Sequence, residues 1–452
     1  MLFTLRYLQA IFPSVSGLLE EELEIKQIMT DSRMKQEDAL FIPIVGENFN
    51  GHDFIHDAIE QGAVAALWEK SVEIPENISS SFVFFIVDDT INALQQLAKF
   101  YKKEINPTII GITGSNGKTT TKDLMAAVLK TTFNTCATVG NFNNHIGLPL
   151  TILQMKRDTE MLILEMGMNH FHEIDLLTKI AEPNFAVITN IGESHIEHLG
   201  SREGIAKAKL EIKNGLQADG LLILDGDEAL LKSFANDKQV ITCGFGMEND
   251  TVISNVQLTH DQTTFQIGNN EYYSIPLLGN HQAKNASYVI TIAKKLGISI
   301  DNIKLGLQAL EHSHMRFELL KGKNGVSIIN DAYNASATSM KAAIMVMKQM
   351  DGFNQKIVVL GDILELGEYA KTLHRSVAEV IDQPIDVLFT YGNHAKIISD
   401  EVKRTKSGIR SNHFDTKEAL LKGLENYIQK DTLILFKASR GMAFEQFIHE
   451  IV

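Results

Sequence analysis

The sequence contains little cysteine, no long apolar run and no excess of basic residues. Its two cysteines, Cys136 and Cys243, are far apart and have no metal-like spacing, so we expect neither a disulfide framework nor a cysteine metal site. The longest apolar runs, such as FVFFIV at residues 82–87, are far too short to cross a bilayer. A net charge of −14 argues against a general nucleic-acid binder, which needs surplus lysine and arginine for phosphate contacts.

The remaining composition is that of an ordinary globular protein, with 44% hydrophobic and 22% charged residues. A chain of 452 residues is too long for one core and predicts two to four domains. No repeat of about 20 to 50 residues is evident, which excludes solenoids. The first residues lack a basic leader followed by an apolar core, so we expect a cytoplasmic protein.

The most informative segment covers residues 107–130 and reads PTIIGITGSNGKTTTKDLMAAVLK. Its isoleucines at 109–112 predict a strand that is buried on both faces. A GSNG turn follows at 114–117. The apolar residues of 118–130 then recur at helical spacing.

A strand, a glycine turn and a helix N-terminus together form an anion cradle, because free backbone N–H groups and the helix dipole point into the turn. Lys118 can reach terminal phosphates, and a neighbouring hydroxyl can hold Mg²⁺. A purely structural turn is the alternative, since Ile112 stands where the common pattern has its first glycine. The predicted phosphate-binding residues are Gly114, Ser115, Asn116, Gly117, Lys118, Thr119 and Thr120.

From 107 to about 312 strands alternate with helices, which predicts a mostly parallel sheet covered on both faces. In such sheets ligands gather beyond the carboxyl ends of the strands. Glu165 ends a predicted strand at 161–165, and His195 follows another at 185–190. We therefore expect both near the phosphate loop, with Glu165 as a Mg²⁺ ligand and His195 as a second ligand. The alternatives are a solvated glutamate and a hydrogen-bonding histidine.

The flanking regions have their own patterns. Residues 1–105 mix short helices and strands and end in a helix over 90–105, capped by Thr90 and stopped by Asn106-Pro107. Alternation over 250–275 predicts a hairpin. From about 315 a second doubly wound domain begins. Its predicted strands cover residues 326–330, 356–360, 387–391 and 432–436.

Several polar residues leave two interpretations open on their chemistry alone. Arg316 either neutralises a transferring phosphoryl group from a neighbouring domain or forms an interdomain ion pair. The run 437–441 either binds a carboxylate or is a basic turn. The spacing of His281 and Asn285 predicts that they share a helix face. There they either bind a nucleotide base or are ordinary polar residues with satisfied hydrogen bonds. Lys209 lies in a predicted amphipathic helix, where most lysines are solvated.

With these pieces in place, the chain resembles the Mur ligase family over nearly its whole length. The motifs that carry the likeness are TDSR (30–33), GENFNGH (46–52), GITGSNGKTTTKD (111–123), GNFNNHIGLPLT (140–151), LEMGM (164–168), NIGESHIEHLGSREGIAKAK (190–209), LLGNHQAKNA (277–286), MRFE (315–318), NDAYNASATSM (330–340), LGDILELG (360–367) and KASRGM (437–442).

The resemblance implies an α/β fold of three domains. A small mixed α/β domain over 1–106 would bind the UDP-linked substrate. A central phosphate-loop domain over 107–313, a doubly wound mostly parallel sheet with a small β extension, would bind ATP. A Rossmann-like α/β domain over 314–452 would bind a dipeptide and close over ATP, swinging about a hinge near 312–315.

The implied activity is that of an ATP- and Mg²⁺-dependent, amide-bond-forming ligase of peptidoglycan synthesis, and hence of cell wall biogenesis, cell shape and cell division. It would join D-alanyl-D-alanine to UDP-N-acetylmuramoyl-tripeptide through an acyl phosphate. We expect a monomer that binds neither nucleic acid nor membrane. The alternatives are a sibling ligase that adds the third peptide residue, folylpolyglutamate synthase and a non-catalytic nucleotide switch or scaffold. The first 105 residues argue against the folate enzyme.

The resemblance also implies residue roles. The catalytic residues would be Lys118, His195, Lys209 and Arg316. The metal ligands would be Thr119, Glu165, His195 and Lys209, the last as a carbamate. Asn285 would contact adenine, Asp331 the ribose and Arg316 the γ-phosphate. The substrate-binding residues would be Asp31, Ser32, Arg33, Asn143, Asn144, Tyr333, Asn334, Ser439 and Arg440.

Overall fold

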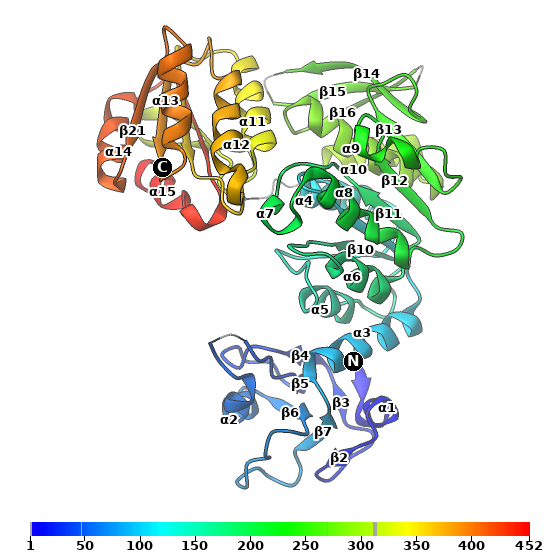
Figure 1. The fold of residues 1–452 in the computed structure, drawn as a ribbon. Coiled ribbons are helices and arrows are strands. Elements are labelled where there is room, and N and C mark those ends of the chain that lie inside the picture. The colour runs from blue at the N-terminus through cyan, green and yellow to red at the C-terminus, as the bar shows by residue number, and fades with distance from the viewer. Residues whose placement is uncertain (1, 47, 260, 269, 311–313) are drawn as a thin grey trace.

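The computed structural model describes residues 2–46, 48–259, 261–268, 270–310 and 314–452, and it consists of three lobes that follow one another along the chain (Figure 1). We call them the N-terminal, central and C-terminal lobes. Each is built around a mostly parallel sheet with helices packed against it. The predicted three-domain α/β architecture is therefore confirmed.

The N-terminal lobe holds a five-stranded sheet of order β2-β7-β6-β5-β4 and a small antiparallel pair, β1 with β3. The strands are β1 (Phe3–Thr4), β2 (Val15–Ser16), β3 (Glu24–Ile25), β4 (Gln27–Met29), β5 (Ala39–Phe41), β6 (Ala63–Glu69) and β7 (Val83–Val87). The helices are α1 (Leu5–Ile11), α2 (Ile55–Glu60) and the 3-10 helix η1 (Gly51–Phe54). The sequence pattern of residues 39–44 predicts a longer strand than β5, which ends at Phe41.

Helix α3 (Thr90–Ile105) joins this lobe to the next, at the residues the sequence predicts. Its N-cap is Asp89, which accepts a 2.6 Å hydrogen bond from Asn92 N, so the prediction of Thr90 as the cap is wrong. The Thr90 hydroxyl donates instead to Pro43 O at 2.7 Å. Buried Lys102 donates to the Ile180 carbonyl at 2.9 Å and fastens α3 to the central lobe.

The central lobe contains a nine-stranded sheet of order β16-β15-β14-β13-β12-β11-β8-β10-β9. Strands β8 (Thr108–Thr113), β9 (Thr135–Ala137), β10 (Met161–Glu165), β11 (Phe185–Ile188), β12 (Leu221–Asp225) and β13 (Val240–Gly244) run parallel. Because helices cover both faces, Ile110 and Ile112 are fully buried. Strand β8 lies between β10 and β11, so the ends of all three strands meet at one edge.

The predicted hairpin is the antiparallel pair β15 (Thr263–Ile267) and β16 (Glu271–Ile275), extended by β14 (Thr251–Leu258). The helices of this lobe are α4 (Lys118–Leu129), α5 (Gly147–Leu153), α6 (Glu173–Ala181), α7 (Ile196–Leu199), α8 (Arg202–Leu210), α9 (Asn280–Lys295) and α10 (Ile300–Gln308), with the 3-10 helices η2 (Glu211–Gly215) and η3 (Ala229–Phe234). The amphipathic helix predicted around Lys209, over residues 201–216, is therefore divided between α8 and η2.

The C-terminal lobe has a six-stranded sheet of order β17-β18-β22-β19-β20-β21, with only β17 antiparallel among the described strands. The strands are β17 (Glu318–Lys321), β18 (Ser327–Asn330), β19 (Gln355–Gly361), β20 (Val387–Tyr391), β21 (Arg410–Phe414) and β22 (Thr432–Lys437). The helices are α11 (Ala337–Gln349), α12 (Ala370–Val377), α13 (Lys396–Thr405), α14 (Lys417–Leu424) and α15 (Glu445–Ile451), with the 3-10 helices η4 (Lys323–Gly325), η5 (Gly367–Tyr369), η6 (Ala378–Val380), η7 (Glu425–Tyr427) and η8 (Arg440–Met442). All four predicted strands are present.

The C-terminal lobe contacts the central lobe beside the phosphate loop. Thr338 Oγ1 donates to Glu193 Oε2 at 2.8 Å. The hydroxyl of Tyr369 donates to Gly200 O at 2.7 Å. The hinge expected near 312–315 lies partly outside the described residues, because 311–313 are not among them.

Two predicted absences can be checked against the described part of the chain. Cys136 and Cys243 are both free thiols. None of the helices among the described residues is both long and apolar enough to span a membrane.

Candidate active site

The phosphate loop connects β8 to α4, and two of its residues must be glycine. Gly114 has φ of +150°, and a Cβ there would lie 1.8 Å from Thr189 Oγ1. Gly117 has φ of +83°, and a Cβ there would lie 2.6 Å from Asn285 Oδ1. Neighbouring elements therefore press directly on the loop backbone, which leaves its other side open.

Side chains and backbone of the β11 end hold the loop in shape. Ser115 Oγ accepts a 2.8 Å hydrogen bond from Gly192 N, and Asn116 N donates to Asn190 Oδ1 at 2.8 Å. Lys118 Nζ folds back to the Gly114 carbonyl at 2.8 Å. Gly117 is the N-cap of α4 and has no side chain to occupy the first helical amides, so these amides are suited to an anion.

Glu165 ends β10 at the same sheet edge, as predicted, and only 3% of its surface is exposed. Its Oε2 accepts from Thr119 Oγ1 at 2.9 Å, and its Oε1 accepts from Asn143 Nδ2 at 2.9 Å. A hydroxyl and a carboxylate in contact beside a phosphate cradle are the hard oxygen donors that Mg²⁺ prefers. The residues present therefore fit a nucleotide-bound Mg²⁺.

Positive charge from two lobes meets at this point. Burial lowers the pKa of Lys118, the Glu165 carboxylate opposes that change, and Arg316 lowers it further. Arg316 comes from the segment that enters the C-terminal lobe, and its guanidinium lies 4.2 Å from the ring centroid of Tyr333. The cation–π contact holds the guanidinium beside the cleft.

Lys209 is only 2% exposed, so the interpretation of this residue as a solvated helix lysine is wrong. Burial lowers its pKa well below the usual value, and Lys118 adds to this effect. No acceptor contacts the Lys209 ammonium among the described residues. Its neighbour Lys207 instead lies over the Phe171 ring, at 5.8 Å from the centroid.

His195 adopts a left-handed backbone conformation, with φ of +64°. Its Nδ1 lies 2.6 Å from Oε2 of Glu365, a residue of the C-terminal lobe. Burial lowers the pKa of His195, the Glu365 carboxylate opposes this, and Lys118 and Lys209 lower it further. A neutral imidazole is the form able to bind a metal.

These residues line one cleft of about 440 Å³ between the central and C-terminal lobes. The predicted site residues that line it are Ser115, Asn116, Gly117, Lys118, Thr119, Thr120, Asn143, Asn144, Glu165, His195, Lys209, Asn285, Arg316, Asp331, Tyr333 and Asn334. Residues up to 220 positions apart in sequence thus meet, as in the 3.3 Å contact of Ser336 Oγ with Asn116 Oδ1.

The side chain of Asp331 is already held in place by two donors. Lys437 Nζ lies 2.6 Å from its Oδ2, and Phe317 N donates to its Oδ1 at 3.2 Å. Lys437 is therefore a cleft residue, whereas the sequence left its run, 437–441, open between carboxylate binding and a basic turn. Its position at the end of β22, next to β18, was the signal that could have identified it.

Other predicted residues lie outside this cleft, and their roles stay predictions. Ser439 Oγ accepts from Leu364 N at 2.9 Å, and Arg440 pairs with Glu445 at 3.2 Å. In the N-terminal lobe Arg33 pairs with Asp31, with 2.6 Å between Nη2 and Oδ2. Ser32 is half-buried and belongs to the same turn.

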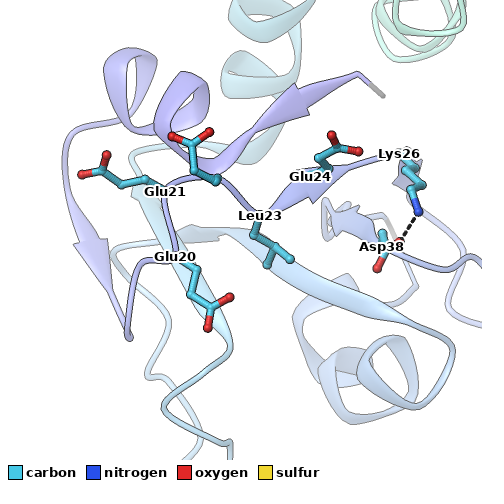
Figure 2. Close-up of a pocket in the computed structure, with 7 residues that line it drawn as sticks. Glu20, Glu21, Leu23, Glu24, Lys26 and Asp38 are labelled. Carbon is cyan, nitrogen blue, oxygen red and sulfur yellow. Dashed lines mark hydrogen bonds and ion pairs between the residues drawn. The ribbon is translucent and has the colours of Figure 1, made fainter.

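A second depression, of about 630 Å³, lies in the N-terminal lobe. Figure 2 shows its carboxylates pointing in different directions, with Lys26 paired to Asp38. It contains none of the predicted site residues. Among the described residues, moreover, no three His, Cys, Asp or Glu side chains are grouped so that they alone hold a metal ion. The residues with the predicted phosphate and metal chemistry line the interlobe cleft instead.

The fold and the cleft define a class: a nucleotide-binding α/β enzyme in which the phosphate loop of one domain and an arginine of the next line the same cleft. Three family models match the chain in order. They are "Mur ligase family, catalytic domain" over residues 24–102, "Mur ligase middle domain" over 112–293 and "Mur ligase, glutamate ligase domain" over 315–440.

Individual proteins are similar over nearly the full length. The UDP-N-acetylmuramoyl-tripeptide–D-alanyl-D-alanine ligase of Bacillus subtilis (strain 168) is 47% identical over 434 residues, which is 96% of this chain and 94% of that protein. The Escherichia coli (strain K12) protein of the same name is 31% identical over 95% of this chain and 94% of its own.

Solved structures agree. A crystal structure of MurF from Acinetobacter baumannii superposes with a TM-score of 0.87 at 30% identity, covering 99% of this chain and 98% of that one. MurF from Thermotoga maritima in complex with ADP gives a TM-score of 0.82 at 28% identity, covering 94% and 96%. The chain belongs to the Mur ligase family. As predicted, it is an ATP-dependent ligase.

Proposed function

We propose that the protein joins D-alanyl-D-alanine to UDP-N-acetylmuramoyl-tripeptide in peptidoglycan precursor synthesis, in the cytoplasm, with release of ADP and phosphate. The observation that carries this proposal is the single cleft that brings Lys118 and Glu165 of the central lobe together with Arg316. The choice of substrates is supported by the name of the relative that is 47% identical over 96% of the chain.

In the first step a carboxylate oxygen of the tripeptide attacks the γ-phosphorus of ATP, and the bond to the β,γ-bridging oxygen breaks. The products are an acyl phosphate and ADP. Because two anions approach each other, the site must offset their repulsion. Lys118 and the α4 amides hold the phosphates, and Arg316 stabilises the charge that develops on the transferring group.

In the second step the amine of the dipeptide attacks the activated carbonyl carbon. The C–O bond to phosphate breaks, phosphate leaves with its electron pair, and the nitrogen loses a proton. Water would compete for the acyl phosphate, so the cleft must exclude it while the amine arrives. Contacts such as Thr338 with Glu193 close the edge of the cleft and serve this purpose.

Thr119 and Glu165 would hold Mg²⁺ when the nucleotide is bound, and Mg²⁺ would supply positive charge that offsets the charge of the phosphates. Their hydrogen bond of 2.9 Å places the two oxygen donors side by side before the ion arrives. Asn143 keeps the Glu165 carboxylate oriented through a second 2.9 Å contact. His195 is a further ligand.

Lys209 would supply a second anionic group, beside Glu165, as a carbamate. Burial holds its pKa well below the usual value, so the amine is available as a nucleophile toward CO₂. The nitrogen attacks the carbon of CO₂ and releases a proton, and the product carries one negative charge. This change would turn a buried amine, which has no acceptor among the described residues, into an oxygen ligand for the metal.

The remaining residues bind the substrates. Asn285 contacts adenine, and Asp331, already oriented by Lys437, accepts from the ribose. The uridine nucleotide is bound by Asp31, Ser32 and Arg33 of the N-terminal lobe. The acceptor in the cleft is bound by Asn143, Asn144, Tyr333 and Asn334. The dipeptide is bound by Ser439 and Arg440.

Phosphate release from ATP tests the proposal, with UDP-N-acetylmuramoyl-tripeptide as acceptor and a panel of amino acids and dipeptides as the second substrate. We expect release that depends on both substrates and is fastest with D-alanyl-D-alanine. Release with a single amino acid and UDP-N-acetylmuramoyl-dipeptide would instead identify the sibling ligase. ATP binding without substrate-dependent release would identify a nucleotide switch.

A further inference from the structure

Residues 362–366 form a loop of the C-terminal lobe that contacts His195. Hydrogen bonds to three other segments hold this loop in place. The carboxylate of Asp362 accepts from His394 N at 2.9 Å and from Ala395 N at 2.7 Å. Ile363 N donates to His374 Nε2 at 3.0 Å. Leu364 N donates to Ser439 Oγ at 2.9 Å, which gives this buried serine a structural task.

The anchored loop then presents Glu365 in a left-handed conformation, with φ of +60°. The residue that it meets, His195, is also left-handed. Their side chains are joined by the 2.6 Å contact between Glu365 Oε2 and His195 Nδ1. The backbones meet as well, because Glu197 N donates to Glu365 O at 3.3 Å. Two strained residues facing each other across a domain boundary mark a functional contact.

We propose that Glu365 is a positioning residue for His195: its carboxylate accepts the Nδ1 proton and so leaves Nε2 unprotonated while the C-terminal lobe is docked. This inference rests on the proposed function, in which His195 is a metal ligand. An ionised carboxylate only accepts hydrogen bonds, and a neutral imidazole has one N–H. The contact therefore fixes the tautomer as well as the orientation of the ring.

The consequence is a link between lobe docking and the metal site. Carboxylates commonly orient metal-binding histidines in this way, although usually from the same domain. Here the carboxylate belongs to another domain, so the His195 ring is oriented only when the two lobes meet. The lobes have other attachments, such as the hydrogen bond of the Tyr369 hydroxyl to Gly200, so the pair is not needed merely to hold them together.

Three variants test the proposal. E365A removes the acceptor. E365Q keeps an oxygen that can accept from Nδ1–H without the charge. E368A is the matched control, because Glu368 is an exposed carboxylate of the same segment for which no hydrogen bond or ion pair occurs within the described residues.

The first readout is the tautomer of His195, measured by ¹⁵N NMR of histidine-labelled protein without nucleotide or metal, with the signal assigned by its loss in H195Q. We expect Nδ1–H in wild type, E365Q and E368A, and a shift toward Nε2–H in E365A. The second readout is turnover: about 10- to 100-fold lower in E365A, within a few-fold of wild type in E365Q, and unchanged in E368A.

A wild-type His195 that is not predominantly Nδ1–H, or an E365A variant with an unchanged tautomer, would overturn the proposal. Turnover that falls equally in E365A and E365Q would also contradict it. Failure of the proposed function looks different: wild-type protein would then lack dipeptide-dependent phosphate release whatever the His195 tautomer is.

Discussion

The Thr119 hydroxyl lies 2.9 Å from Glu165 Oε2, so the first turn of α4 and the end of β10 meet through one hydrogen bond. Asn143 Nδ2 contacts the other carboxylate oxygen at 2.9 Å. Neutral donors thus hold a buried carboxylate in a fixed orientation beside the phosphate loop. Thr119 and Glu165 would hold Mg²⁺ at this position, where the ion would supply positive charge beside the phosphates.

Glu165→Gln tests this arrangement. The amide keeps the size of the side chain but loses the charge that holds Mg²⁺, so we expect turnover to fall about a hundredfold, with a higher Mg²⁺ requirement. Phosphate release over a Mg²⁺ titration measures both effects. E160Q is the control, since Glu160 precedes the same strand at its opposite end. Equal behaviour of the two variants would show that the Glu165 charge is not used.

Lys118→Ala should reduce turnover by about a thousandfold, effectively abolishing it, because the lysine neutralises the transferring phosphate. The fold should remain intact, which circular dichroism and the thermal unfolding midpoint will report. K130A, an exposed lysine just after the same helix, should behave like wild type. Near-normal turnover in K118A would contradict the proposal that the phosphate loop binds the transferring phosphate.

Gly117→Ala separates backbone strain from steric contact. Both Gly117 (φ +83°) and Gly297 (φ +76°) are left-handed, but only at Gly117 would a Cβ collide, 2.6 Å from Asn285 Oδ1. We expect each alanine variant to lose about 1 kcal/mol of stability. Only G117A should also weaken ADP binding, by at least about tenfold in calorimetric titration. Equal ADP affinity in G117A and G297A would mean that the loop tolerates displacement of Asn285.

The stability of the C-terminal lobe should depend on pH through His374. Burial lowers the pKa of this histidine from its usual value near 6.5. The unfolded chain therefore binds a proton below about pH 6.5 that the folded chain does not, and folding stability falls as the pH is lowered through that window. Above it, the neutral ring accepts from Ile363 N without cost.

Urea unfolding of wild type and H374Q at pH 7.5 and 5.5 measures this effect. Glutamine can accept from Ile363 N but does not titrate. We therefore expect H374Q to gain stability relative to wild type at the lower pH, measured as the difference between their free energies of unfolding. The change is at most about 1.4 kcal/mol per pH unit. All other histidines are present in both proteins, so their contributions cancel in the difference between the two free energies of unfolding. A difference that is the same at both pH values would contradict the assignment.

Local patterns predicted the central part of this site. The strand, glycine turn and helix at residues 107–130 are specified by neighbours in sequence, and Glu165 follows from the rule that parallel strands end at one edge. The cap of α3 shows the limit of such reasoning. Asp89 and Thr90 are both capable caps, and Thr90 is drawn away by a carbonyl from the N-terminal lobe, at Pro43.

Tertiary contacts determine features of the site that no local sequence pattern predicts. Lys209 and Lys207 occupy the same short helix, and only packing against the cleft determines that one is buried and the other exposed. The resemblance to a known family identified Lys209, whereas residue chemistry alone dismissed it. The contact of Glu365 with His195 joins residues 170 positions apart in different lobes, so no local pattern contains it.

We propose that ATP activates a carboxyl group of the acceptor in the interlobe cleft. The most direct test labels that carboxyl group of UDP-N-acetylmuramoyl-tripeptide with ¹⁸O and analyses the phosphate released in the presence of ATP and D-alanyl-D-alanine. An acyl phosphate predicts one ¹⁸O atom in each released phosphate. Phosphate without ¹⁸O, formed at the same rate as the amide product, would contradict the account.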